Sequence, residues 1–184
     1  MWSEALGSQD WSWENTLPYY KRSCKFTPPN IDKIGHEFDI PYDIDAFSPN
    51  GGPLEVSYGD YRGAYVNPVA KGFERIGLKK LNGLNSGNLI GYGAITLTID
   101  PETLTRSSSE TSFLQSVIGK SGLKIYHSTL AKKIVFDDEK RATGVLVAAK
   151  GQVDYEFVLS AKKEVIVSAG VAGYPFLSAK WVHS

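Results

Sequence analysis

A two-residue period of apolar and polar side chains, running from Leu123 to Gly170, constrains the fold more than any other feature of this sequence. Side chains of a β-strand point alternately to the two faces of a sheet, so this period predicts four or five short strands. The polar stretches "DDEKRA" and "AKGQV" predict the hairpin turns between them. The last stretch, "EVIVSAG", is nearly all apolar around Ile166 and predicts a central strand covered on both faces. We therefore expect residues 123–170 to form one sheet that carries most of the core.

The segment before this sheet has the clearest helical signal. In "RSSSETSFLQSVIGKSG", residues 106–122, Ser107 and Glu110 have the spacing of a capping box. The apolar residues that follow recur at helical spacing and predict a buried stripe, which consists of Phe113, Leu114, Val117 and Ile118.

Shorter elements are predicted further upstream. "AYVNPVAKGFERIGLKK" predicts a helix with Val69, Phe73 and Ile76 on one face. "PLEVSYG" at 53–59 and "AITLTID" at 94–100 predict strands.

The N-terminal segment "WSWENTLPYYKRSCKFTPP" predicts a capped helix. Ser12 is placed to accept a hydrogen bond from the backbone of Asn15. Trp13, Leu17 and Tyr20 recur at helical spacing and predict a buried stripe, and Pro28-Pro29 is expected to end the helix. Residues 30–53 are rich in Pro, Asp, Asn and Gly and are predicted to be loop.

The fold class expected from these elements is α+β, an antiparallel sheet with flanking helices. We divide the chain into an N-terminal helix and linker region (1–52), a strand-and-helix part (53–122), a β-meander (123–170) and a tail without pattern (171–184).

Composition narrows the possible partners. Twenty Lys and Arg residues balance twenty Asp and Glu residues, so the chain lacks the basic excess of a nucleic-acid-binding protein. No apolar run approaches the length needed to span a membrane. Cys24 is the only cysteine, which excludes an internal disulfide and a thiolate metal cluster.

Five blocks together resemble the glucose–methanol–choline (GMC) family of FAD-dependent oxidoreductases, in its fungal branch. The N-terminal block quoted above resembles that family's Trp-x-Trp and Leu-Pro-Tyr segment, and the others are "GGPLEVSYGDY", "TRSSSETSFL", "LKIYHSTLAKKIVFDDEKRATGVLV" and "AKKEVIVSAGVAGYP". They stand in the family's order and cover about residues 10–175. The resemblance implies an antiparallel-sheet substrate domain together with part of an FAD-binding sheet.

The resemblance also implies that parts of the family's machinery lie outside this sequence. The family's FAD domain opens with a G-x-G-x-x-G turn that holds the pyrophosphate, and "GNLIGYGAI" does not have that spacing. The start of the dinucleotide-binding fold is therefore expected to be missing. The apolar surface that this half would cover is expected either to be covered by the tail, through Tyr174, Phe176, Leu177 and Trp181, or to form a homo-oligomer contact. The family's catalytic histidine is expected beyond the C-terminal end, so His36, His127 and His183 are interpreted as ordinary residues rather than catalytic ones.

Six positions are candidates for binding by this resemblance. The family brackets the adenine with backbone atoms of the strand position occupied here by Ala131, and its ribose and adenine approach the segment Ser168, Ala169 and Gly170. Tyr92 and Arg106 belong to the substrate side. The alternatives are plain sheet packing for Ala131, a strand-end turn for residues 168–170, a packed surface aromatic for Tyr92, and a residue beside a helix cap for Arg106.

The function implied by the resemblance is part of an FAD-dependent oxidoreductase acting on the CH–OH group of a small-molecule alcohol, sugar or polyketide-like metabolite. Because the pyrophosphate turn and the histidine are absent, we expect the chain to be inactive alone and do not expect it to hold FAD alone. One alternative is a shortened, non-redox relative that binds or cyclises a small apolar metabolite. Another is a subunit that completes a second chain.

Overall fold

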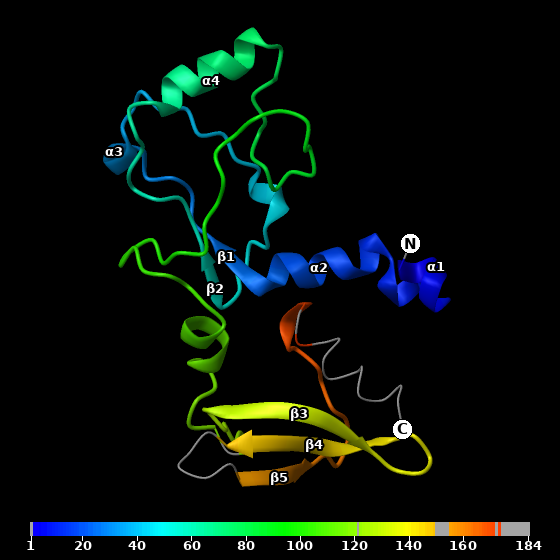
Figure 1. Ribbon diagram of the computed structural model, residues 1–184. Coiled ribbons are helices and arrows are strands. Elements are labelled where there is room, and N and C mark those ends of the chain that lie inside the picture. Colours follow the sequence, from blue (N-terminus) through cyan, green and yellow to red (C-terminus); the bar gives the residue numbers. More distant parts are fainter. Residues whose placement is uncertain (1, 121, 150–154, 172, 174–184) are drawn as a thin grey trace. The chain divides into compact units, whose positions relative to one another are not determined.

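The structure is a computed structural model that describes residues 2–120, 122–149, 155–171 and 173. The chain divides into two compact units, residues 1–123 and residues 124–184 (Figure 1). Helices and strands are both present, and neither sheet is closed, which confirms the mixed fold class. The finer four-part division stays a prediction. Within the described residues, no helix is long and apolar enough to cross a membrane.

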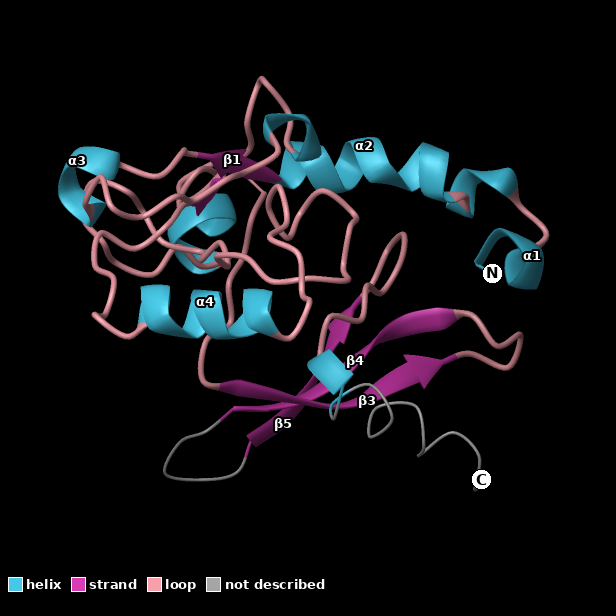
Figure 2. Ribbon diagram, turned by 90° about the horizontal axis from the view of Figure 1, so that it is seen from above, coloured by secondary structure: helices cyan, strands magenta, loops and turns pink. Residues whose placement is uncertain are grey.

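The first unit consists of short elements joined by long loops (Figure 2). Its α-helices are α1 (Trp2–Leu6), α2 (Trp13–Ser23), α3 (Ile31–Ile34) and α4 (Val66–Arg75). Its strands are β1 (Cys24–Phe26) and β2 (Leu54–Val56), which pair in parallel. Single helical turns lie at Gln9–Trp11, Ile44–Ala46 and Glu110–Leu114.

Helix α2 begins as the sequence predicts and ends earlier. The Ser12 side chain accepts a hydrogen bond from the backbone N–H of Asn15 at 3.3 Å. The helix ends at Ser23, where β1 follows directly, so the prediction that Pro28-Pro29 ends it is wrong. The predicted buried stripe is also wrong, because Trp13 is 63% exposed and Tyr20 is 66% exposed. Helical spacing places side chains on one face but does not supply a surface to cover that face.

Aromatic packing joins the two short strands to the loop between them. The ring of Phe26 in β1 stacks on Phe47 with centroids 4.2 Å apart, and it meets the edge of Tyr58 at 6.1 Å. Ile34 and Ile40 pack in the same core as Tyr58. Residues 30–53 are therefore largely irregular, as predicted, but they supply three core side chains that a loop prediction did not anticipate.

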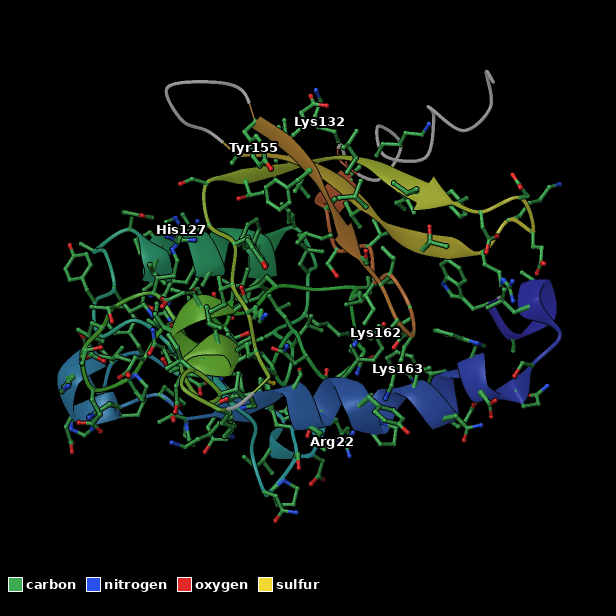
Figure 3. The ribbon with its side chains drawn as sticks, turned by 90° about the horizontal axis from the view of Figure 1, so that it is seen from below. Arg22, His127, Lys132, Tyr155, Lys162 and Lys163 are labelled. Carbon is green, nitrogen blue, oxygen red and sulfur yellow. The ribbon has the colours of Figure 1, made fainter. Side chains whose placement is uncertain are left out.

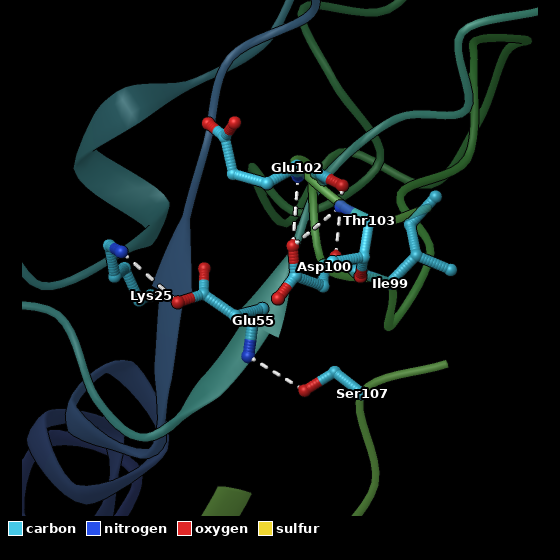
Figure 4. A network of polar contacts seen from close by, with 8 residues as sticks. Lys25, Glu55, Ile99, Asp100, Glu102, Thr103 and Ser107 are labelled. Carbon is cyan, nitrogen blue, oxygen red and sulfur yellow. Dashed lines mark hydrogen bonds and ion pairs between the residues drawn. The ribbon is translucent and has the colours of Figure 1, made fainter. Parts of the chain in front are cut away.

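A buried serine replaces the predicted cap of the 106–122 helix. Ser107 is 6% exposed, and its hydroxyl accepts a hydrogen bond from the backbone N–H of Glu55 in β2 at 3.0 Å (Figure 4). The reciprocal pair is instead Ser108 with Thr111: each side-chain oxygen accepts from the other's backbone N–H, at 3.2 and 2.8 Å. The capping box therefore lies one residue further along, because the core already uses Ser107.

Two further predictions in this region are wrong. The long helix is a single π-helical turn, Glu110–Leu114, followed by turns, and two members of its predicted buried stripe are exposed, Phe113 by 44% and Ile118 by 53%. Residues 94–100 form no regular strand, only isolated bridges that pair Leu97 with Ser57 and Ile99 with Arg106.

The second unit is a three-stranded antiparallel sheet. It consists of β3 (Thr129–Phe136), β4 (Ala142–Ala149) and β5 (Tyr155–Ser160), in that spatial order. The predicted turn "DDEKRA" is confirmed: the Asp137 carboxylate accepts hydrogen bonds from the backbone N–H groups of Glu139 and Arg141, at 3.0 and 2.9 Å. The second predicted turn, "AKGQV", lies mostly outside the described residues, as does most of the tail.

The apolar run before Gly170 does not form the predicted central strand. Within the described residues the sheet ends at β5, residues 164–169 have no strand pairing, and Ile166 is 77% exposed. A run of apolar residues becomes a central strand only when other segments pair with both of its edges. The core also lies elsewhere than predicted. The buried hydrophobic residues of the first unit are Ile34, Ile40, Phe47, Val56, Tyr58 and Leu81, whereas the second unit contributes Val147.

Replacing Ser107 with Ala should destabilise the first unit by about 1–3 kcal/mol, because the part-buried N–H of Glu55 loses its acceptor. Urea unfolding of the full chain measures this change. The matched control is Ser109→Ala, since Ser109 is exposed and its side chain makes no capping hydrogen bond. Equal stability losses in the two variants would mean that Ser107 acts only as another surface serine.

Replacing Ile166 with Asp should change stability by no more than about 0.5 kcal/mol, because the side chain is already open to water. Replacing Val147 with Asp should unfold the sheet of the second unit, because Val147 is 4% exposed and an unpaired buried carboxylate costs several kcal/mol. Thermal unfolding followed by circular dichroism compares the two variants. Unfolding of the Ile166 variant would restore the central-strand assignment.

Candidate functional site

An open hollow of about 290 Å³ lies in the first unit, between helix α4 and the loops around residues 38–40 and 92–95. Val69, Ala70 and Phe73 line it from the helix. Residues four apart in a helix lie on one face, which explains why Val69 and Phe73 reach the same hollow. The predicted helix is confirmed, and its apolar face is half-exposed, with Val69 at 46% and Phe73 at 37%.

Tyr92, a predicted substrate residue, lies in the wall of this hollow. Its backbone is fixed by two hydrogen bonds: its N–H donates to the Lys79 carbonyl at 3.0 Å, and its carbonyl accepts from the Leu81 N–H at 2.9 Å. Gly91 permits this close approach, since a Cβ at that position would lie 2.4 Å from the Lys79 carbonyl oxygen. The strand-like pairing therefore holds Tyr92 at a defined position.

The Tyr92 side chain is part of a small polar and aromatic contact. Its hydroxyl donates to a carboxylate oxygen of Glu74 at 2.6 Å, and its ring packs on Phe73 with centroids 5.6 Å apart. The hydrogen bond to Glu74 is the main cause that raises the pKa of Tyr92 above its ordinary value, and partial desolvation and the carboxylate charge act in the same direction. Tyr92 is therefore a neutral donor already engaged by Glu74, not an acid.

Two basic side chains line the hollow, and they differ in their partners. Lys80 forms an ion pair with Asp39, with Nζ and the carboxylate oxygen 2.7 Å apart. The Nε and Nη2 atoms of Arg62 are buried and have no hydrogen-bond partner in the described part of the chain. The Arg62 guanidinium lies over the ring of Tyr58, 5.9 Å from its centroid.

Arg106, the other predicted substrate residue, lies away from these contacts. It is exposed, its backbone pairs with Ile99, and it does not line the hollow. Its role in binding a substrate stays a prediction.

The predicted nucleotide contacts all lie in the second unit. Ala131 is half-buried in β3, which forms one edge of the described sheet, and the pairing with β4 shifts register directly after it. Ser168, Ala169 and Gly170 are exposed. Gly170 has φ of 73°, and a Cβ there would meet no atom within 4 Å. An edge strand and an open glycine leave backbone atoms accessible, so these residues fit contact with a nucleotide, and that role stays a prediction.

Other side chains considered from the sequence have ordinary surroundings. The His36 side chain is 82% exposed beside Asp32, and His127 is exposed with Ser128 as its neighbour (Figure 3). His183 lies outside the described residues. Burial raises the pKa of the Cys24 thiol, which keeps it protonated. Among the described residues, no cluster of His, Cys, Asp and Glu could hold a metal ion.

Sequence patterns missed Arg62 and Glu74. Arg62 lies between a predicted strand and a predicted helix and belongs to no recognisable motif. Glu74 is indistinguishable in sequence from an ordinary surface charge on the predicted helix. Their proximity to Tyr58 and Tyr92 depends on the path of the loops, which a local pattern does not specify.

Replacing Glu74 with Gln should lower the pKa of Tyr92 toward the ordinary tyrosine value, because the charged acceptor is lost. The raised pKa means that this bond stabilises the fold below the ordinary tyrosine pKa, and the contribution is lost as pH rises through the folded pKa. Titration of tyrosinate absorbance in the full chain should show one tyrosine ionising at lower pH in the variant.

Two controls make this titration specific. In a Tyr92→Phe background, Glu74→Gln should produce no further change, and Glu164→Gln in the second unit should leave the titration curve as it is. A Glu74→Gln curve identical to that of the unmodified chain would contradict the Tyr92–Glu74 bond.

Comparison with known proteins places this architecture in a family. A model of the GMC oxidoreductase family matches residues 1–179. The chain is 44% identical over 176 residues to the glucose methanol choline oxidoreductase atC of Aspergillus terreus, covering 96% of this chain and 28% of the relative. It is 38% identical to the patulin synthase of Aspergillus clavatus and 38% identical to the versicolorin B synthase stcN of Emericella nidulans, with the same coverage of 96% and 28%.

Solved structures have the same fold as this chain. An FAD-dependent oxidoreductase from Chaetomium thermophilum superposes with a TM-score of 0.85 at 28% identity, over 95% of this chain and 29% of that one. A fungal aryl-alcohol oxidase shares the fold, with a TM-score of 0.83 at 21% identity, over 92% of this chain and 28% of that one. The chain thus spans about 28% of the length of the curated relatives it matches. On the match along residues 1–179, the chain belongs to the GMC oxidoreductase family, whose members depend on FAD.

Proposed function

We propose that this chain is part of an FAD-dependent oxidoreductase that acts on the CH–OH group of a small fungal metabolite. The observation that carries the proposal is the continuous family match over residues 1–179. Relatives named as an oxidoreductase, a patulin synthase and a versicolorin B synthase support a role in secondary metabolism. The hollow beside Tyr92 supports a compact, mainly apolar substrate, because aromatic and aliphatic side chains make up most of its walls.

The second unit would contribute to holding the cofactor. The backbone of Ala131, at the edge of the sheet, would contact the adenine, and the open backbone of Ser168–Gly170 would allow close approach of the ribose. FAD, when bound, supplies the hydride acceptor for alcohol oxidation. The sequence contains no G-x-G-x-x-G turn, and none of the described histidines lines the hollow, so we expect the chain alone to turn over no alcohol.

A second candidate is a non-redox activity that binds or cyclises a small apolar metabolite. The hollow supports it, since its walls come from the first unit alone and include none of the residues proposed to contact FAD. A role as a subunit that completes another chain is a further alternative.

A chimera tests the proposed function. The segment of the atC oxidoreductase that matches this chain over 176 residues is replaced by the corresponding residues of this chain. We expect a yellow protein that retains FAD and reduces a dye acceptor when given primary or aromatic alcohols. A folded but colourless chimera would contradict the FAD proposal, and a yellow chimera that cyclises its substrate without reducing the dye would favour the second candidate.

A matched pair of glycine variants tests the cofactor contact within the chimera. Replacing Gly170 with Val should lower FAD occupancy about tenfold or more, because a branched side chain at positive φ strains the segment and fills its open side. Gly77→Val is the control, since Gly77 also has positive φ and open space around it but lies after α4. Equal losses of FAD in both variants would assign the effect to strain alone.

A further inference from the structure

We propose that the hollow beside Arg62 binds the carboxylate-bearing end of a small aromatic molecule. This inference deepens the proposed function by naming a substrate class. It rests on the proposed function only where it treats the bound molecule as a substrate. Binding itself depends only on residues of the first unit.

The Arg62 side chain has two buried donor atoms that lack a partner in the described part of the chain. These atoms are Nε and Nη2, and buried donors in proteins are nearly always paired. The Arg62 guanidinium lies over the ring of Tyr58, and the distance of 5.9 Å to the ring centroid is near the limit for a cation–π contact. A carboxylate presents two oxygens that match the fork of a guanidinium, and the long Arg stem allows the fork to turn toward an occupant of the hollow.

The neighbouring charges direct an anion to Arg62 rather than elsewhere in the hollow. Lys80, the other cation in the lining, is already neutralised by Asp39. Glu74 does not line the hollow, but its carboxylate accepts the hydrogen bond of Tyr92, which does, and it would repel a second carboxylate placed near Tyr92. An acid would therefore place its charged end at Arg62 and its apolar end near Phe73 and Tyr92.

The shape and chemistry of the walls favour an aromatic body. Four aromatic residues are part of the lining, Phe38, Tyr65, Phe73 and Tyr92. A cavity of about 150 Å³ accommodates benzene, so a hollow of about 290 Å³ has room for a fused two-ring molecule. An aryl carboxylate of that size satisfies both the walls and Arg62.

The test compares 2-naphthoate with 2-naphthamide, which has the same rings and no charge. Binding to the full 184-residue chain is measured by calorimetry without FAD. The acid should bind roughly tenfold or more tightly than the amide, because a charge-assisted bond to Arg62 is added. In Arg62→Met this difference should vanish, and in Arg62→Lys it should be partly retained.

Two further variants locate the site. Arg22→Met is the matched control. Arg22 in α2 (Figure 3) also lies over a tyrosine ring, that of Tyr19 at 4.9 Å, but it does not line the hollow. It should leave both ligands unaffected. Ala70→Phe should weaken both ligands at least tenfold, since the added ring fills the hollow while Arg62 remains.

The proposal is overturned if acid and amide bind equally, if Arg62→Met retains the preference for the acid, or if Ala70→Phe binds both ligands normally. Should Arg62→Met fail to fold, Arg62→Lys and Ala70→Phe decide the question. Because no flavin or turnover enters the measurement, loss of the acid preference overturns the site alone. A colourless chimera, by contrast, overturns only the proposed redox function.

Discussion

The ring of Phe26 is the contact on which the first unit depends. It stacks on Phe47, meets Tyr58 edge-on and contacts Tyr42 at 5.4 Å, so the loop that contains residues 42–47 and the segment directly after β2 converge on one side chain. The strands that flank this cluster have only three residues each, and such a short ladder cannot position the loops by itself. Burial of several aromatic rings supplies the apolar area that the ladder lacks.

The candidate binding site is built directly on this core. Ile40 packs against Tyr58 in the core and also lines the hollow, so the back of the hollow is the core itself. The guanidinium of Arg62 lies over the ring of Tyr58, 5.9 Å from its centroid. Arg62 therefore contacts the same aromatic cluster that packs beside β1 and β2.

Sequence patterns correctly predicted the structural features that depend only on residues close in sequence. The Ser12 cap, helix α4 and the hairpin between β3 and β4 are correct because each is decided within a few residues. The prediction for residues 106–122 was wrong because three successive serines, at positions 107–109, can each cap a helix. The first of them, Ser107, instead accepts a hydrogen bond from the backbone N–H of Glu55, which is 52 residues away in sequence. The predicted strand around Ile166 was wrong because an apolar pattern shows that a segment would need a partner strand at each edge, but it does not show that such partners exist.

The same limit applied to the candidate site. The resemblance to a family pointed to Tyr92, but nothing in the sequence paired it with Glu74 or placed Arg62 beside the same hollow. Both contacts arise from the path of loops that the Phe26 cluster holds together.

A unit with so few ladder hydrogen bonds must satisfy its buried polar groups by other means. Ser57, which is 1% exposed, donates its hydroxyl to the carbonyl of Ile99 at 3.0 Å, and Ser107 accepts from β2 in the same region. Glu55 retains one unpaired buried oxygen, but its other oxygen is paired with Lys25. Arg62 differs from Glu55 because two of its nitrogens are unpaired and they belong to a side chain that lines a hollow. In a fold that otherwise places serines to satisfy its backbone, these two nitrogens on a side chain that lines a hollow are the reason for proposing a ligand beside Arg62.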